Sequence, residues 1–510
     1  MPSRHILALV APAWGHAGPY VHLTTRMLAS DPSLVVTIVQ HNNFVTRMQK
    51  EFDSCSYDKS RLKIEGVGDK DLPSSPENIK DALDQLTAGW FQLLAAAVAG
   101  GSNWPQPKTL HLDFFGGGLV IEESKLLIGP DGKVLLWCST GVSACMDDLS
   151  KHDYAKIAHE IYTDESRRAG RTMDDILGDV VCAANGSDKL DGRVLESVGG
   201  LRMYDHEHVA QGAGSAGSLR PFAAMMASAQ KLTQQVDGIF FPASSALEAA
   251  GVAFAREHYK KRGQELFFLG PQMHDDEWGV PSAGPGPTDE RVKAFLDNSR
   301  KEYGPKSVLY ISFGSIFFPM MTPHLVEVMI DVLLSLQNVV PFVFVLGGGM
   351  ASLPEATIDR IHASGRGIVC AHWVDQKAIL KGGVVGWFLT HGGYNSTTEA
   401  LSQGIPLIFW PIGAEQAYNA ALLSTGPRPI GIELFQIRAG SQMGPSLRPE
   451  APKITGTVQD AKIEFQQAFR DIKGLRGETL GRNALRIAEL WHEERINGEA
   501  VQEIERLTRF

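Results

Sequence analysis

The chain has 510 residues, of which 44% are hydrophobic and 21% are charged, and its formal net charge is -10. This is the composition of a folded globular protein, and the length favours two domains over a single core. Because the balance is acidic and no long basic run occurs, nucleic acid is excluded as an expected partner. The five cysteines form no Cys-x-x-Cys pair, so neither a disulfide framework nor a zinc ribbon is predicted.

Membrane-spanning and targeting segments are not indicated by the sequence. No stretch reaches the roughly 20 apolar residues that a spanning helix needs. The apolar run at 5–12 is too short to cross a bilayer, and no signal-peptide cleavage site follows it. We therefore expect a cytoplasmic protein with no membrane span. We also expect it to be a monomer.

The first half of the chain alternates short apolar runs with helix-like segments. A buried strand at 5–12 ends in a tight loop rich in proline and glycine, and a helix over about 19–29 and a second strand at 34–39 follow. The pattern recurs with strands at 109–114 and 133–138. Strand, helix and strand within about 35 residues predict a parallel sheet with crossover helices.

The clearest linker follows, at 273–288, where prolines stand among glycines and acidic residues. Beyond it the alternation restarts, and the charged tail at 479–510 has the periodicity of a helix. The strands predicted in this half lie at 307–313, 341–346, 367–370, 384–389 and 406–410.

These patterns predict two α/β domains. We assign 1–272 to the first, 273–288 to the linker, 289–478 to the second, and 479–510 to a helical tail that packs back toward the first domain. In open parallel sheets, ligands bind beyond the carboxyl ends of the strands. Two facing sheets would therefore form one cleft between the domains, which is where we expect a small-molecule site.

A dense group of polar residues follows two predicted strands of the second half. His391-Gly392-Gly393 stands at a strand end, and Asn395 and Ser396 open a helix. A helix N-terminus with hydroxyl side chains and close glycines is suited to bind phosphate. Ser396 and Glu399 can also be read as a plain capping box, which would indicate only the start of a helix.

The stretch from Trp373 to Gln416 resembles the donor-binding signature of the UDP-glycosyltransferases (family 1 glycosyltransferases) of plant and fungal secondary metabolism. The order Trp, Gln, His-Gly-Gly, Asn-Ser, Glu, Gly-x-Pro, Trp-Pro, acid-Gln is matched at the family's spacing. Three places depart from the usual pattern: Asp375 stands where proline is common, Tyr394 where tryptophan is common, and Lys381-Gly382-Gly383 where a histidine segment is usual. The resemblance implies the GT-B fold, in which two Rossmann-like domains with parallel sheets face each other across a cleft.

The resemblance also implies roles for individual residues in binding a UDP-sugar. Trp373 and Gln376 would bind uracil and ribose, and Glu399 would accept the ribose hydroxyls. The sugar hydroxyls would be bound by Glu415 and by Gln416, a terminal glutamine that usually accompanies glucose donors. The diphosphate would be held by His391, Asn395, Ser396 and the upstream Ser315, and Gly393 and Tyr394 would contribute backbone or stacking contacts.

A histidine and an aspartate in the first half form the expected catalytic pair. A neutral imidazole at His16, in the loop after the first strand, is suited to remove a proton from an attacking hydroxyl. Such a base needs an orienting acid, and Asp113 ends a predicted strand. Pattern alone leaves open a solvated histidine and a helix-capping aspartate, whereas the family's catalytic base and acid fall at these places. The resemblance thus implies an inverting hexosyltransferase that needs neither metal nor other cofactor beyond the UDP-sugar co-substrate.

The acceptor is less constrained by the sequence. We expect a small hydroxylated acceptor that is lipophilic or aromatic, and the candidate pocket residues, which could equally be core, are Trp14, Trp90, Phe114 and Phe115. Two other functions remain open on the same fold, a catalytically silent nucleotide-sugar-binding protein and an epimerase-like enzyme. The Gly-x-Gly-x-x-Gly run at 212–217 has no strand before it, so we interpret it as a loop rather than a dinucleotide site.

Overall fold

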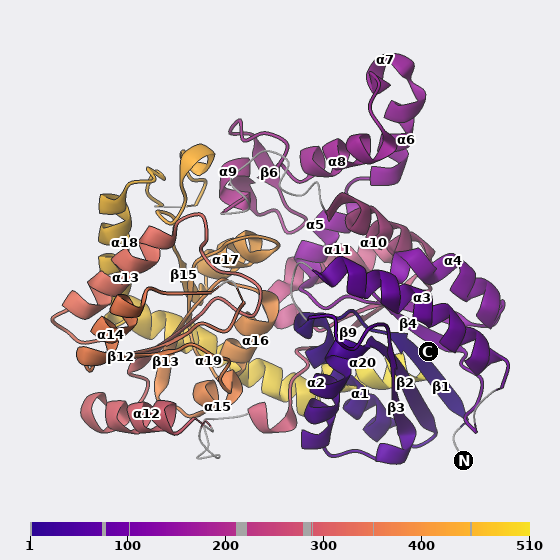
Figure 1. The fold of residues 1–510 in the computed structure, drawn as a ribbon, viewed down its shortest axis with the longest axis horizontal. Coiled ribbons are helices and arrows are strands. Elements are labelled where there is room, and N and C mark those ends of the chain that lie inside the picture. Colours follow the sequence, from indigo (N-terminus) through magenta and orange to yellow (C-terminus); the bar gives the residue numbers. More distant parts are fainter. Residues whose placement is uncertain are drawn as a thin grey trace. The chain divides into compact units, whose positions relative to one another are not determined.

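The structure, a computed structural model, consists of two compact units, each built on its own parallel sheet (Figure 1). The first unit comprises Met1–Ala184, Leu219–Asp275 and Glu493–Phe510, and the second comprises Asn185–Ser218 and Asp276–His492. The predicted α/β fold class is confirmed. The run at 212–217 and most of the predicted linker lie outside the described residues, which are 3–73, 78–100, 103–210, 222–278, 287, 289–349, 351–448 and 451–510.

The first unit contains a seven-stranded sheet in the order β3-β2-β1-β4-β5-β8-β9. Every neighbouring pair is parallel. All eight residues of β2 are buried, as expected for a parallel strand covered on both faces by helices. The strands are β1 Arg4–Leu9, β2 Leu34–His41, β3 Leu62–Val67, β4 Thr109–Asp113, β5 Lys133–Trp137, β8 Gly238–Phe241 and β9 Glu265–Phe268.

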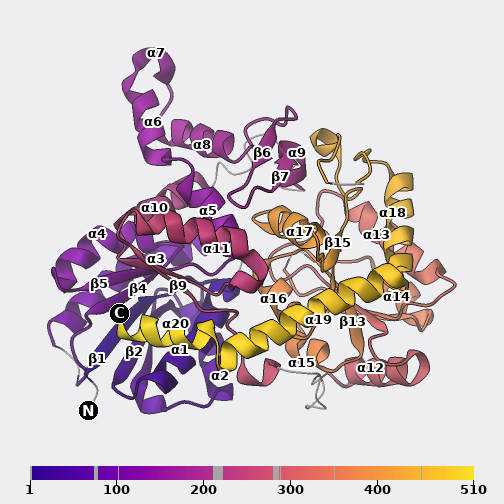
Figure 2. The same ribbon diagram turned by 180° about the vertical axis from the view of Figure 1, so that it is seen from behind.

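Helices connect the strands of this sheet. A further helix of the unit, α20, comes from the C-terminal end of the chain. Ile504 and Leu507 of α20 lie in the same apolar cluster as residues of β1 and α1, and α20 packs beside α1 and β9 (Figure 2). The helices of this unit are α1 Trp14–Ser30, α2 Asn42–Ser54, α3 Ile79–Val98, α4 Gly117–Ile128, α5 Val142–Ser150, α6 Tyr154–Thr163, α7 Glu165–Arg168, α8 Met173–Ala184, α10 Ala223–Gln235, α11 Ser245–Lys260 and α20 Glu499–Arg509.

The second unit contains a six-stranded sheet in the order β12-β11-β10-β13-β14-β15, again parallel throughout. A short antiparallel hairpin, β6 with β7, belongs to the same unit. The strands are β6 Val194–Glu196, β7 Arg202–Tyr204, β10 Val308–Ser312, β11 Phe342–Val345, β12 Gly367–Cys370, β13 Val385–Thr390, β14 Leu407–Phe409 and β15 Gly431–Glu433.

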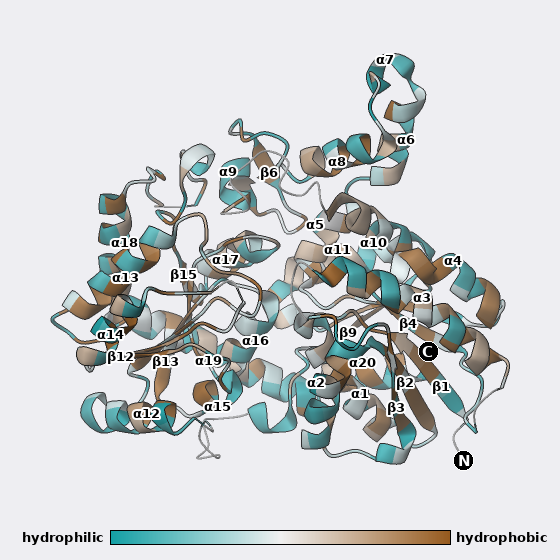
Figure 3. Cartoon of the chain, viewed as in Figure 1, coloured by the Kyte–Doolittle hydropathy of each residue, from teal (hydrophilic) through white to brown (hydrophobic). Residues whose placement is uncertain are grey.

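Helices α12 and α18 of the second unit bury apolar residues such as Leu296 and Phe465, and both carry hydrophobic and hydrophilic residues in Figure 3. This amphipathic pattern is what a surface helix over a buried sheet requires. Among the described residues, no helix has the length and apolar character needed to cross a membrane. The helices are α9 Asp205–His208, α12 Glu290–Tyr303, α13 Pro323–Ser335, α14 Glu355–Ala363, α15 Gln376–Lys381, α16 Tyr394–Ser402, α17 Gln416–Ser424, α18 Val458–Asp471 and α19 Leu475–Ile496.

Each sheet has a point where its strand order reverses direction. In the first unit the chain builds from β1 outward through β2 to β3, and then returns to place β4 on the other side of β1. In the second unit β10 and β13 flank the corresponding point. Loops at such a switch point leave in opposite directions and open a crevice beyond the carboxyl ends of the strands. These two places are therefore where functional side chains are to be sought.

The segment at 185–218 belongs to the second unit. In the chain, however, it comes before β8 and β9, which belong to the first unit. Arg438 forms ion pairs with Glu433 at 3.1 Å and donates to the backbone carbonyl of Glu207 at 3.2 Å. Arg448 lies 3.2 Å from Glu433 and 3.7 Å from the carboxylate of Glu207. The four side chains are almost fully buried, and their formal charges cancel, so this cluster fastens the segment without leaving a net buried charge.

We predict that Glu433→Gln destabilises the protein by about 3–5 kcal/mol, because it leaves two buried guanidinium groups with too little negative charge. Urea and thermal unfolding measure the effect. The control is Arg476→Ala, which removes an exposed partner of Asp471 and should hardly move either transition. Equal effects of the two substitutions would contradict a structural role for the buried cluster.

Candidate functional site

The loops after β10 and β13 approach each other closely at the switch point of the second sheet. Gly314 follows β10 and has a positive φ of +79°. A Cβ atom at this position would lie 2.8 Å from Cε1 of His391, which follows β13. Glycine is therefore required here for two reasons: the backbone has a positive φ, and His391 leaves no room for a Cβ atom. The structure thus places the predicted phosphate loop, with the exposed Ser315, directly beside the His391 loop.

Helix α16 begins within the predicted motif. Its first residue is Tyr394 and its N-cap is Gly393, so Ser396 is the third helical residue. The capping-box interpretation of Ser396 is therefore wrong, because a capping serine would precede the first helical residue. Asn395 and Ser396 instead lie in the first turn, where backbone N–H groups and the positive end of the helix dipole favour anions. Glu415 accepts a hydrogen bond from the Tyr394 N–H at 3.2 Å.

The imidazole of His391 is buried and neutral. Burial lowers the pKa of His391 to about 4, so the ring carries no charge at physiological pH. The hydroxyl of Thr390 lies 3.3 Å from its Nδ1 atom, and the ring of Phe317 stacks at 5.8 Å. A neutral imidazole held in this way can donate one hydrogen bond without adding a buried charge.

Gln376, Glu399 and Tyr310 form a hydrogen-bonded chain on neighbouring elements. The Gln376 side-chain amide donates to the Glu399 carboxylate at 2.5 Å, and the Tyr310 hydroxyl donates to the Gln376 carbonyl at 3.2 Å. The structure therefore brings together two predicted site residues that are 23 positions apart in the chain. Tyr310 is not predicted from the sequence, because an aromatic residue in the middle of an apolar strand has the pattern of a core residue.

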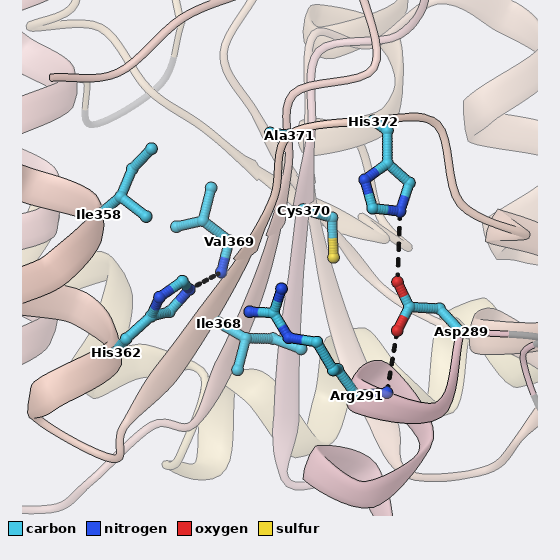
Figure 4. Close-up of a pocket in the computed structure, with 9 residues that line it drawn as sticks. All are labelled: Asp289, Arg291, Ile358, His362, Ile368, Val369, Cys370, Ala371 and His372. Carbon is cyan, nitrogen blue, oxygen red and sulfur yellow. Dashed lines mark hydrogen bonds and ion pairs between the residues drawn. The ribbon is translucent and has the colours of Figure 1, made fainter. Parts of the chain in front are cut away.

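Trp373 is an exposed aromatic side chain, with 58% of its surface accessible. A flat, exposed tryptophan beyond a strand end is suited to stack on a planar ring. The residue before it, His372, is tied to the start of α12 by Asp289, with 3.3 Å between Nε2 and the carboxylate. His372 and Asp289, but not Trp373, line a cavity of about 180 Å³ at the outer edge of β12, where Arg291 and Cys370 also point inward (Figure 4).

Gln416 is almost fully buried and fixes the loop that precedes α17. Its side-chain carbonyl accepts hydrogen bonds from the N–H groups of Ile412 at 2.9 Å and Gly413 at 3.0 Å. Asn419, one turn further on, donates to the carbonyl of Gly392 at 2.9 Å. A residue just beyond the predicted motif is thus bonded to the glycine that follows His391. Asn419 was missed in the sequence, since asparagine within a helix gives no specific signal.

His16 and Asp113 meet at the switch point of the first sheet. The distance from Nδ1 of His16 to Oδ1 of Asp113 is 2.8 Å. His16 lies in the first turn of α1, not in a loop, and the predicted helix start near Pro19 is wrong, because α1 begins at Trp14 and contains that proline. Burial of Ala17 and Tyr20 against the sheet outweighs the proline's local preference.

Asp113 holds the imidazole in one orientation. It is fully buried, and its Oδ1 also accepts the backbone N–H of Phe115 at 2.9 Å. It does not cap a helix, because the N-cap of α4 is Gly116. When Nδ1 of His16 donates to Asp113, Nε2 is left as the basic atom. The pair therefore has the arrangement of a general base and its orienting acid.

Aromatic side chains surround His16 on one side. The ring of Phe115 lies 4.4 Å from the His16 ring, and Phe114 lies 5.5 Å from Phe115. Trp14 is partly exposed and is covered on one face by the Arg47 guanidinium at 3.9 Å. Trp90 is different, and its predicted place in an acceptor pocket is wrong. It has no accessible surface, and its indole N–H donates to Ser124 at 2.8 Å, so it is a core residue.

The chain is similar to known UDP-glycosyltransferases in sequence and in fold. The family model for UDP-glucoronosyl and UDP-glucosyl transferase matches residues 279–434. The UDP-glycosyltransferase eriJ of Hericium erinaceus is 26% identical over 92% of this chain and 90% of its own length. A Polygonum tinctorium UDP-glucosyltransferase capable of glucosylating indoxyl superposes with a TM-score of 0.69 at 18% identity, over 100% of this chain and 98% of its own. Medicago truncatula UGT71G1, whose structure contains UDP-glucose, superposes with a TM-score of 0.67 at 17% identity. The superposition covers 99% of this chain and 98% of that protein.

We predict that Gly314→Ala destabilises the second unit more than a positive φ alone would. An alanine in the left-handed region costs about 1–2 kcal/mol, and here its Cβ would also press on His391 at 2.8 Å. Thermal unfolding checks this result.

Gly440→Ala is the matched control, because Gly440 also has a positive φ, of +63°, but no atom within 4 Å of its added Cβ. If the two variants lose the same stability, the close approach of the two loops is not a constraint on the fold.

Proposed function

We propose that this chain, which belongs to the UDP-glycosyltransferase family, transfers a hexose from a UDP-sugar to a hydroxyl group of a small lipophilic or aromatic acceptor. Glucose is the sugar we expect. The observation that carries the proposal is the hydrogen bond between His16 and Asp113. It supplies a base for the acceptor hydroxyl, whereas a protein that only binds nucleotide sugars has no need of one.

The second unit supplies the donor site in this proposal. The uracil base stacks on Trp373, and Glu399, oriented by Gln376, accepts the ribose hydroxyls. Both oxygens of a carboxylate accept, so one can hold Gln376 while the other meets a ribose hydroxyl. The diphosphate lies at the first turn of α16, close to Ser396 and the neutral His391, and receives further hydrogen bonds from Ser315. Glu415 and Gln416 contact the sugar.

The transfer proceeds by direct displacement. Nε2 of His16 takes the proton of the acceptor hydroxyl while its oxygen bonds to the anomeric carbon, and the bond from that carbon to UDP breaks on the opposite face, which inverts the configuration. Positive charge develops on the sugar, and negative charge develops on the leaving diphosphate. The N-terminal end of α16 stabilises that negative charge, so the step as proposed needs no metal ion and no further cofactor.

The acceptor lies against the aromatic side chains around His16. Phe114 and Phe115 are partly exposed and offer flat apolar surfaces next to the base, and we propose Trp14, two residues before His16 in α1, as a further acceptor contact. Such surfaces favour a ring-containing acceptor over a free sugar. The Polygonum enzyme's use of indoxyl supports the same class of acceptor.

The proposal places the enzyme in the cytoplasm as a monomer without nucleic-acid partners. The acidic net charge of -10 supports the exclusion of nucleic acid. The described helices give no support for a membrane span.

We predict that His16→Ala lowers kcat with UDP-glucose by about 10²–10⁴-fold, which is the usual contribution of a general base. The affinity for UDP stays unchanged, because the substitution is in the other unit. An acceptor panel of phenols and sterols, read by mass spectrometry, measures turnover, and calorimetry measures UDP binding. Asp113→Asn should lower kcat in the same direction.

His159→Ala, which changes an exposed histidine of α6, is the control and keeps full activity. Retained turnover in His16→Ala would exclude His16 as the base. Sugar products formed without any acceptor would instead indicate the epimerase-like alternative, and UDP binding without turnover on any acceptor would indicate a silent binding protein.

A further inference from the structure

A tyrosine hydroxyl lies inside the apolar core of the second unit. Tyr310 stands in the middle of β10, whose five residues are all buried. It is 1% exposed, and its ring packs edge-on against the ring of Phe388 at 4.9 Å. A phenylalanine would fill this apolar place as well, whereas a buried hydroxyl is costly unless it has a hydrogen-bond partner. The hydroxyl of Tyr310 therefore points to a role beyond packing.

The partner of this hydroxyl is the side-chain amide of Gln376. The oxygen of Tyr310 lies 3.2 Å from Oε1 of Gln376, and Nε2 of the same amide lies 2.5 Å from Oε2 of Glu399. Gln376 and Glu399 are partly exposed, whereas Tyr310 is buried. One amide thus connects a core residue to a carboxylate that a ligand can reach.

This chain of hydrogen bonds has one consistent direction. An ionised carboxylate can only accept, so Gln376 must present its NH₂ group to Glu399. The carbonyl of the amide then faces Tyr310, which must donate. Burial, and next the charge of Glu399, raise the pKa of Tyr310 well above its ordinary value, so the hydroxyl keeps the proton that it donates. A turned amide would place its oxygen against the carboxylate.

The backbone around Gln376 is fixed by its own hydrogen bonds. Gln376 is the first residue of α15, and the N-cap residue Asp375 accepts the N–H of Ala378 at 3.1 Å. The N–H of Gln376 donates to the carbonyl of Val374 at 2.8 Å. The orientation of the side-chain amide is what remains to be fixed, and the Tyr310 hydroxyl fixes it.

We propose that Tyr310 is a positioning residue that, through Gln376, aims Glu399 at the ribose hydroxyls and so sets a preference for ribonucleotides over deoxyribonucleotides. The inference rests on the proposed function, in which Glu399 accepts those hydroxyls. Tyr310 is buried and does not touch the nucleotide. Without its hydroxyl, the amide of Gln376 is no longer held in one orientation, and the carboxylate of Glu399 loses its aligned partner.

The test is calorimetric binding of three nucleotides: UDP, 2′-deoxy-UDP and 3′-deoxy-UDP. We expect the unchanged protein to bind UDP more tightly than the deoxy forms. Tyr310→Phe should reduce this preference about 3–10-fold, the usual net effect of one hydrogen bond, by weakening UDP and leaving the deoxy forms nearly unchanged. Glu399→Gln should lower the preference by itself, and adding Tyr310→Phe to it should then have no further effect, because both residues act through one chain.

Tyr303→Phe, which removes the hydroxyl of an exposed tyrosine of α12 in the same unit, is the control and should keep the full preference. Circular dichroism and thermal unfolding show that the variants are folded. An unchanged preference in Tyr310→Phe, or equal weakening of all three nucleotides, would overturn the role of Tyr310 while leaving the proposed donor site intact. If the unchanged protein binds the three nucleotides equally, or binds none, the donor site itself is wrong, and the role of Tyr310 falls with it.

Discussion

Parallel strand pairing is the constraint on which the rest of this structure depends. Because all strands of each sheet run in one direction, all their carboxyl ends open at one edge. At the switch point, neighbouring strands send their loops to opposite sides and leave a crevice. His16 and Asp113 lie at that point in the first sheet, and Gly314 and His391 lie at it in the second. The same topological rule therefore positions the candidate residues within each unit.

The two switch points meet opposite electrostatic needs. Proton removal by the proposed base His16 needs a fixed imidazole orientation, and the buried carboxylate of Asp113 lies 2.8 Å from its Nδ1 atom. Binding of a diphosphate needs hydrogen-bond donors that are not already paired with an anionic side chain. We propose that the neutral ring of His391, whose pKa burial lowers to about 4, and the first turn of α16 provide these donors. The two units thus differ in the side chain that each buries beside the carboxyl ends of its strands: a carboxylate in the first and a neutral imidazole in the second.

Long apolar strands and the donor motif could be predicted from the sequence, because both are local patterns. The predicted strand at 367–370 coincides with β12, and the others differ by a few residues at their ends. Short or half-exposed strands such as β3 and β15 were missed, since β15 has three residues and β3 has exposed polar positions. Trp90 and Tyr310 were misjudged because burial of an aromatic side chain depends on tertiary packing. The place of 185–218 in the second unit rests on the buried pairs of Glu207 and Glu433, which no local pattern reveals.

We propose that the switch point of the second sheet binds the diphosphate of a uridine nucleotide. A crystal structure of the protein with UDP would show where the nucleotide binds. We expect the diphosphate at the first turn of α16, within hydrogen-bonding distance of Ser396, and the base stacked on Trp373. A nucleotide bound elsewhere, or one whose phosphates point away from α16, would rule out this assignment.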